Sequence, residues 1–235
     1  MTAVYRSGLG SRVVVRDGVR ELHVDGTFAS CYEPGCVITG SVWDALAAGI
    51  AALPRQRRRS VLLLGLGGGS AARVVRALAP RARIVGVEID PSVVRLARRY
   101  FDLDALGIEV VLDDARAYLE RCRKRFDAVL EDVFIGTGRD AVKPEWLPQP
   151  GLARAAGCLA RCGILASNAL DEAPAVSAAM GRLFSSVVRI EVDDYDNQIF
   201  LGCSRALTGR ELRRAVAATP VLVPTLRGLS FRTVR

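Results

Sequence analysis

The sequence predicts an α/β fold in which a mostly parallel sheet is covered by helices on both faces and closed by an antiparallel pair of strands. Three observations support this class. Short apolar runs of strand length alternate with helical patterns between residues 61 and 203. A glycine-rich turn joins the first of these runs to a helix, and acidic residues follow several of the runs. Alternation of this kind is typical of parallel strands connected by crossover helices.

Residues 1–38 are predicted to form a small antiparallel β unit ahead of the main domain. The pairs Asp17-Gly18 and Asp25-Gly26 are hairpin turn signals, and they lie between runs in which apolar and polar residues alternate. The pair Pro34-Gly35 ends this unit.

Residues 39–217 are predicted to form the main domain. Thr39 or Ser41 can cap its first helix, and Asp90 followed by Pro91 is a helix start signal. The expected strands are 61–64, 83–88, 108–112, 126–131 and 163–167, with an antiparallel pair at 186–192 and 198–203. The expected helices are 42–53, 69–79, 91–101, 115–122, 151–160, 174–184 and 209–217. Residues 218–235 are predicted to be an extended basic tail.

The composition limits the possible classes of protein. A chain of 235 residues, half of them hydrophobic, can bury one sizeable core. It has no apolar run of about 18 residues and no signal-peptide pattern, so we expect a cytoplasmic protein without a membrane span. The six cysteines are scattered and there is one histidine, so reduced structural thiols are favoured over a zinc site and no metal is predicted.

The net charge of +8 comes mainly from arginine. The densest run is Arg55-Gln56-Arg57-Arg58-Arg59, and no aromatic residue interrupts it for base stacking. The run is therefore interpreted as solvated helix and loop surface, and nucleic acid is not predicted as a partner.

The stretch from residue 61 to residue 90 has the layout of a nucleotide-binding crossover unit. A strand leads into a turn containing Gly65, Gly67, Gly68 and Gly69, and the next strand ends on Glu88. An acid at that place can accept hydrogen bonds from the two hydroxyls of a ribose. The dinucleotide spacing G-x-G-x-x-G fails at Ser70, which favours an adenosyl sulfonium ligand over NAD and makes an oxidoreductase the least favoured alternative.

Acidic residues follow two further strands of the predicted sheet. Asp113 and Asp114 follow the third strand, and Glu131 and Asp132 close the fourth. Since parallel strands end at the same edge of a sheet, these acids are expected to share one crevice with Glu88. Asp114 could instead be only the cap of helix 115–122.

At these residues the sequence resembles the spermidine synthase family, the polyamine aminopropyltransferases built on the Rossmann-like SAM-methyltransferase fold. The resemblance extends from about residue 10 to residue 205. It is carried by the stretches VLLLGLGGGSAARVV, VGVEIDPSVVRLARRYF, LDDARAYL, FDAVLED and DNQIFLGCS.

The resemblance implies a role for each candidate residue. Glu88 would hold the ribose, Asp113 and Asp114 the adenine amino group, and Asp132 would orient and help to deprotonate the attacking amine. The other donor-site residues would be Gly65, Leu66, Gly67, Gly68, Ile89 and Ala115. Asp44 and Glu131 would contact the acceptor. The N-terminal strands could pair two subunits, so a homodimer is expected.

The sequence departs from the family where the amine binds. Gly68 replaces an aspartate, Ile135 replaces the second acid of the catalytic loop, and Val42 and Trp43 replace a tyrosine and its following histidine or glutamine. The glutamine after the second hairpin falls near Ala29 or Ser30. We therefore expect the family's donor half with a different acceptor half, and an unfamiliar entrance loop at 133–150.

The leading hypothesis is a transferase that uses S-adenosylmethionine (SAM) or decarboxylated SAM to alkylate a small-molecule nucleophile, such as an amine. SAM is favoured because Gly68 would leave room for the donor carboxylate and removes an anion that would repel it. The alternative is a non-catalytic relative that binds a nucleoside or serves as a subunit, which loss of the acceptor pocket would explain.

Overall fold

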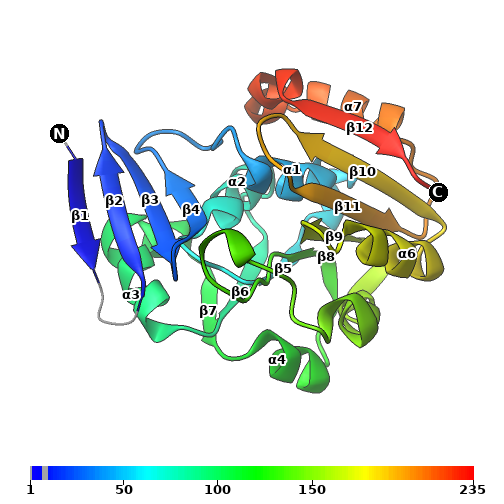
Figure 1. The fold of residues 1–235 in the computed structure, drawn as a ribbon. Coiled ribbons are helices and arrows are strands. Elements are labelled where there is room, and N and C mark those ends of the chain that lie inside the picture. The colour runs from blue at the N-terminus through cyan, green and yellow to red at the C-terminus, as the bar shows by residue number, and fades with distance from the viewer. Residues whose placement is uncertain (1, 7–9) are drawn as a thin grey trace.

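The computed structural model describes residues 2–6 and 10–235, and contains two sheets (Figure 1). The smaller sheet is antiparallel in the order β1-β2-β3-β4 and forms the N-terminal unit. Its strands are β1 (Thr2–Arg6), β2 (Arg12–Arg16), β3 (Val19–Val24) and β4 (Thr27–Tyr32). Residue 1 and residues 7–9, which fall in the predicted unit 1–38, lie outside the described residues.

The larger sheet has the strand order β12-β10-β11-β9-β8-β5-β6-β7. Its parallel part consists of β5 (Ser60–Leu64), β6 (Arg83–Glu88), β7 (Glu109–Leu112), β8 (Phe126–Glu131) and β9 (Leu159–Ala169). The antiparallel strands are β10 (Ser186–Val192), β11 (Gln198–Cys203) and β12 (Leu229–Thr233). The predicted fold class is confirmed.

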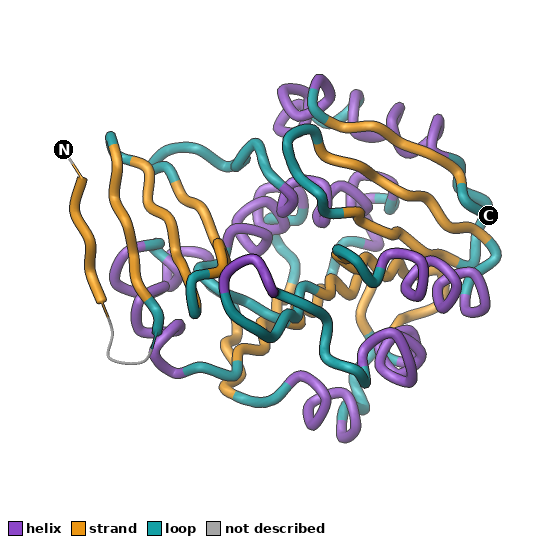
Figure 2. Tube along the Cα trace, in the orientation of Figure 1, coloured by secondary structure: helices purple, strands orange, loops and turns teal. Residues whose placement is uncertain are grey.

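Helices lie on both sides of this sheet (Figure 2). They are α1 (Val42–Ala48), α2 (Ser70–Leu78), α3 (Pro91–Tyr100), α4 (Ala115–Arg121), α5 (Leu152–Gly157), α6 (Ala173–Leu183) and α7 (Gly209–Ala217). Leu63 belongs to the core that includes residues of α1, α2 and α7, and Leu62 to the core with α4, α5 and α6. Neighbouring residues of β5 thus face opposite sides, which is why the strand is apolar throughout.

A third cluster attaches the N-terminal sheet to the main domain. Val13 of β2 and Leu22 of β3 pack with Val93 and Leu96 of α3 and with Phe101. Helix α3 itself starts as predicted, because the Asp90 carboxylate accepts a hydrogen bond from the Ser92 amide at 2.6 Å. The small sheet is therefore held against the carboxyl end of β6, from which α3 continues.

Residues 218–235, predicted as an extended basic tail, fold onto the large sheet, and only β12 among them is an extended strand. A 3₁₀ segment, Pro220–Arg227, buries Leu222 completely, and β12 adds to the edge of the large sheet by pairing with β10. Apolar residues such as Leu222 and Leu229 lack helical or alternating spacing, so the pattern suggested an extended segment. Their burial depends on α7 and β10, which lie earlier in the chain.

No helix within residues 2–6 and 10–235 has both the length and the apolar character needed to cross a membrane.

Candidate donor and acceptor site

The glycine-rich turn after β5 packs directly against the rest of the candidate site. Gly65, Gly67 and Gly69 have φ values of +80°, +53° and +88°, a region that other residues rarely occupy. A Cβ atom on Gly65 would lie 2.5 Å from the carbonyl oxygen of Asp132. Glycine at position 65 is therefore required both by the torsion and by the close approach of the chain at the end of β8.

Glu88 is held at the end of β6 by backbone amides. The Gly67 amide donates to Oε2 at 2.9 Å, and the amides of Ile89 and Asp90 donate to Oε1 at 3.0 and 3.1 Å. Burial raises the pKa of the Glu88 carboxyl, while these amides favour its ionised form. A carboxylate has about four acceptor positions, so Glu88 keeps capacity for a further donor such as a hydroxyl.

The end of β7 lies beside Glu88. Leu112 is the register partner of Glu88, and the Asp113 amide donates to the Glu88 carbonyl oxygen at 2.9 Å. Ile89 and Leu112 are 64% and 56% exposed. Two exposed apolar residues therefore neighbour Glu88, one in the chain and one in the sheet, and a planar base could pack on such side chains.

The other predicted residues at this strand end have structural contacts of their own. Asp113 forms an ion pair with Arg121. Asp114 caps α4, accepting a hydrogen bond from the Ala117 amide at 2.9 Å, so the capping role that the sequence left open is present. Ala115 is buried in the first turn of α4.

Asp132 is fixed by two neutral donors. The indole Nε1 of Trp43 donates to Oδ2 at 3.0 Å, and Nδ2 of Asn168 donates to Oδ1 at 2.8 Å. Asn197 in turn donates to Oδ1 of Asn168 at 2.9 Å. Each carboxylate oxygen of Asp132 has one of these partners and can accept another hydrogen bond.

The residues that orient Asp132 were not among the predicted site residues. Asn168 lies in the last part of β9, which ends at the same edge of the sheet as β8. A polar residue at a strand end was the signal that could have identified it, as it identified the acids. Trp43 lies on α1, and its contact with Asp132 spans 89 positions of the chain, which no local pattern reveals.

Glu131 and Asp44 have no open surface, each being 1% exposed. Glu131 accepts hydrogen bonds from Lys143 Nζ at 2.6 Å, the Val133 amide at 2.7 Å and the Ser167 hydroxyl at 2.5 Å. Burial raises the pKa of Glu131, an effect that the ammonium group of Lys143 opposes. The carboxylate therefore anchors the chain after β8 through Lys143.

Asp44 has a similar anchoring role at the start of α1. Its carboxylate accepts hydrogen bonds from the amides of Thr39 and Gly40, at 3.0 and 2.7 Å, and burial raises its pKa. These contacts hold the chain that leads from the N-terminal sheet into α1.

The entrance loop 133–150 is tied to the N-terminal sheet. Ile135 and Val142 pair as an isolated bridge. Beyond them, the Gly138 amide donates to the Asp25 carbonyl oxygen at 2.9 Å, and the Thr27 hydroxyl donates to the Gly138 carbonyl oxygen at 3.1 Å. The loop therefore spans from Asp132 to the turn between β3 and β4. Ile135 remains 53% exposed on it.

Gly68 does not leave open space, contrary to the expectation from sequence. A Cβ atom there would lie 2.8 Å from Cβ of Ser30 and 2.9 Å from Cδ1 of Phe101, and the Gly68 amide donates to the Ser30 hydroxyl at 2.7 Å. The room expected for a donor carboxylate is thus filled by Ser30 and Phe101. Gly68 still carries no anion that would repel a donor carboxylate.

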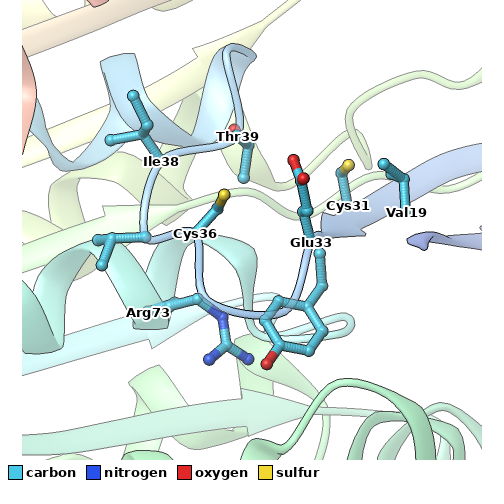
Figure 3. A pocket seen from close by; sticks show the side chains of 9 residues that line it. Val19, Cys31, Glu33, Cys36, Ile38, Thr39 and Arg73 are labelled. Carbon is cyan, nitrogen blue, oxygen red and sulfur yellow. The ribbon is translucent and has the colours of Figure 1, made fainter. Parts of the chain in front are cut away.

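A separate cavity of about 110 Å³ lies between β4, residues 33–39 and Arg73 (Figure 3). The guanidinium of Arg73 stacks over the Tyr32 ring, with its carbon 3.9 Å from the ring centroid. None of Glu88, Asp113 and Asp132 lines this cavity, which is small for a nucleoside. Within the part of the chain that the structure describes, no three His, Cys, Asp or Glu side chains gather as metal ligands do.

Comparisons with known proteins identify relatives of this chain. The sequence model of the spermine/spermidine synthase domain matches residues 44–141, which is less than half of the chain. The eEF1A lysine and N-terminal methyltransferase homolog of Drosophila melanogaster is 42% identical over 97 residues, covering 40% of this chain and 14% of that protein. This chain matches between 12% and 40% of the length of these and other curated relatives.

Two solved structures share the fold. A probable spermidine synthase from Corynebacterium glutamicum superposes with a TM-score of 0.77 at 20% identity, covering 99% of this chain and 90% of that chain. Human methyltransferase-like protein 13, solved in complex with SAH, gives a TM-score of 0.65 at 24% identity, covering 79% of this chain and 92% of that chain. The resemblance to the spermidine synthase family is thus confirmed, and the relatives of this chain are transferases of methyl or aminopropyl groups.

Proposed function

We propose that this protein is a transferase that moves the methyl group of SAM to an amine, with Glu88 and Asp132 holding the two reactants. The observation that carries the proposal is that the Glu88 carboxylate and the main chain of Asp132 both lie against one glycine turn. Glu88 accepts from the Gly67 amide, and Gly65 lies against the main chain of Asp132. A donor bound to Glu88 would therefore have its sulfonium end near Asp132.

The donor half follows from the end of β6. Glu88 would accept a hydrogen bond from a ribose hydroxyl, and Ile89 and Leu112 would cover the adenine, with Asp113 at its edge. Binding the nucleoside in this way positions the sulfonium for attack, and positioning alone can lower the barrier by several kcal/mol.

In the reaction, the lone pair of the amine attacks the methyl carbon, the carbon–sulfur bond breaks, and a neutral thioether leaves. The nitrogen becomes positively charged and gives up a proton. Asp132 is the acceptor for that proton, and Trp43 and Asn168 hold its carboxylate in place while it acts.

The acceptor half favours a single amino group over a diamine. A diamine carries two positive charges, and their desolvation requires several carboxylates. Asp44 and Glu131 are buried and hydrogen-bonded to other groups of the protein. Of these three carboxylates, Asp132 is therefore the one that can accept a further hydrogen bond from the acceptor. An aminopropyl group would likewise need an anion for its ammonium, and the family's aspartate is Gly68 here.

Calorimetry and turnover together test this proposal. We expect SAM to bind wild type, and Glu88→Ala to weaken it at least tenfold, whereas Asp193→Ala, an exposed carboxylate in the turn between β10 and β11, leaves affinity unchanged. Asp132→Asn should retain donor affinity but lose transfer of labelled methyl to amine acceptors. Tight binding of decarboxylated SAM with aminopropyl transfer would replace the methyl assignment.

A non-catalytic nucleoside-binding subunit is the second candidate, and the burial of Asp44 and Glu131 favours it. Such a protein would bind SAM or its thioether product but would transfer no label to any amine in a cell extract. We also propose that two copies of the chain form a homodimer through the N-terminal sheet. One chain has a mass of 25.3 kDa, and light scattering should give twice that mass.

A further inference from the structure

A second charged cavity lies at the opposite edge of the large sheet from Glu88. It has a volume of about 460 Å³ and is lined by six residues, which we call the arginine cleft: Arg55, Gln56, Arg58, Arg59, Arg81 and Arg83. Arg59 directly precedes β5 and Arg83 begins β6, whereas Glu88 ends β6. A strand of this length separates the two edges by roughly 16 Å, so the arginine cleft is distinct from the donor site.

Two of the five arginines are held by the protein itself. The guanidinium of Arg58 donates to the carbonyl oxygens of Leu53, Leu78 and Ala51 at 2.9, 3.2 and 2.9 Å. Arg83 is paired with Glu109 at the start of β7, with its Nε 3.1 Å from Oε2. These contacts build the wall of the arginine cleft.

The other three arginines are exposed and have no anionic partner. Within the described residues, the guanidinium groups of Arg55, Arg59 and Arg81 make no hydrogen bond or ion pair. Burial, and after it the nearby charge of Arg55, lowers the pKa of Arg58. The neighbouring carboxylate of Asp127 accepts from the amides of Arg59 and Ser60 and from the Ser60 hydroxyl.

Positive charge continues along this edge beyond the arginine cleft. The exposed residues Arg123, Lys124 and Arg125 directly precede β8, the neighbour of β5 in the sheet. Arg57 donates to the carbonyl oxygen of Arg161 in β9 at 2.7 Å, which brings Arg161 to the same edge. Basic residues therefore lie near the starts of four adjacent strands, β9, β8, β5 and β6.

We propose that the arginine cleft binds the phosphate backbone of a nucleic acid. Guanidinium groups bind phosphate oxygens in a bidentate manner, and an open row of them fits repeated phosphates. Its lining includes no aromatic side chain for a base and no glycine turn, unlike pockets for a single nucleotide. Binding would therefore be independent of base sequence and would weaken steeply with salt.

The test is fluorescence anisotropy of a labelled 20-nucleotide single-stranded RNA, with the full chain, at several salt concentrations. The cleft variant is Arg55→Gln/Arg59→Gln/Arg81→Gln. The control, Arg210→Gln/Arg213→Gln/Arg214→Gln on α7, removes the same charge from exposed positions elsewhere. We expect the cleft variant to bind about tenfold or more weakly at 0.1 M salt, with a slope of log affinity against log salt shallower by about 2. The control should stay within about threefold of wild type.

Equal losses in both variants would overturn the proposal, because net charge would then explain the binding. Absence of RNA binding by wild type would also overturn it, and needs no variant. If inorganic tripolyphosphate binds the cleft and RNA does not, the ligand is a small polyphosphate and the nucleic-acid assignment fails. Circular dichroism melting curves verify that both variants are folded.

Discussion

The indole Nε1 of Trp43 lies 3.0 Å from Oδ2 of Asp132 and donates a hydrogen bond to it. Trp43 occupies a position where the resemblance places a polar residue of the amine site. The indole N–H gives Asp132 a neutral donor, and the ring packs edge-on against Phe28 of β4, with centroids 5.2 Å apart. The substitution therefore converts a substrate-facing position into one that orients the proposed catalytic carboxylate.

Trp43→Phe should remove the donor and keep most of the packing. We expect methyl transfer to fall about tenfold, corresponding to loss of one hydrogen bond to a charged group, about 1.5 kcal/mol, with donor affinity unchanged. Trp146→Phe is the matched control, because Trp146 is the other tryptophan of the chain and, among the described residues, the side-chain donors to Asp132 are Trp43 and Asn168. If Trp43→Phe has full activity, the indole N–H does not orient Asp132.

Gly65→Ala should damage the site more than the same change at Gly35. Their φ values are similar, +80° and +87°, so both variants incur the strain of a left-handed alanine, about 1–2 kcal/mol. Only at Gly65 does the new Cβ meet a neighbour, the Asp132 carbonyl oxygen, whereas nothing lies within 4 Å at Gly35. Denaturant unfolding should show a larger loss for Gly65→Ala, with loss of SAM binding. Equal losses would mean that the close approach has no effect.

Nucleoside binding should weaken as the pH falls. The midpoint of this loss should lie above the ordinary pKa of a glutamate side chain. The ionised carboxylate of Glu88 is the better acceptor for ribose hydroxyls, and burial raises its pKa. Affinity is therefore full above this raised pKa and is lost as the pH falls through it. Calorimetry with methylthioadenosine between pH 8 and pH 5 measures the effect. Glu88→Gln should bind weakly with no such pH dependence, and a parallel decline in both proteins would assign the titration to another group.

Lys143→Met should destabilise the fold strongly. The Lys143 and Glu131 side chains are 0% and 1% exposed and 2.6 Å apart, so removing the cation leaves a buried uncompensated carboxylate. Losing one partner of such a pair typically costs about 3–5 kcal/mol, measured by denaturant unfolding. Adding Glu131→Gln should recover part of the loss. Lys124→Met, which removes the other lysine from an exposed pair with Glu109, should change stability little.

Local patterns predicted the elements of the main domain closely. Strand β8, predicted at 126–131, is Phe126–Glu131, and α7, predicted at 209–217, is Gly209–Ala217. Both have strong signals, an apolar run and a capping residue at Thr208, that act within one element. Strand β12 was missed because it is stabilised by pairing with β10, about 40 residues earlier in the chain, rather than by a pattern of its own.

For the candidate site, spacing along the chain was enough to predict that the turn at Gly65–Gly69, Glu88 and Asp132 lie at one edge of the sheet, since these residues follow neighbouring parallel strands. Packing in three dimensions determined the rest. It buried Asp44 and Glu131 against their own partners, filled the space at Gly68 with Ser30 and Phe101, and brought Trp43 and Asn168 to Asp132. It also placed Arg81 and Arg83 beside Arg55 and Arg59. Backbone preferences act between near neighbours, whereas burial and charge depend on which distant segments the fold brings into contact.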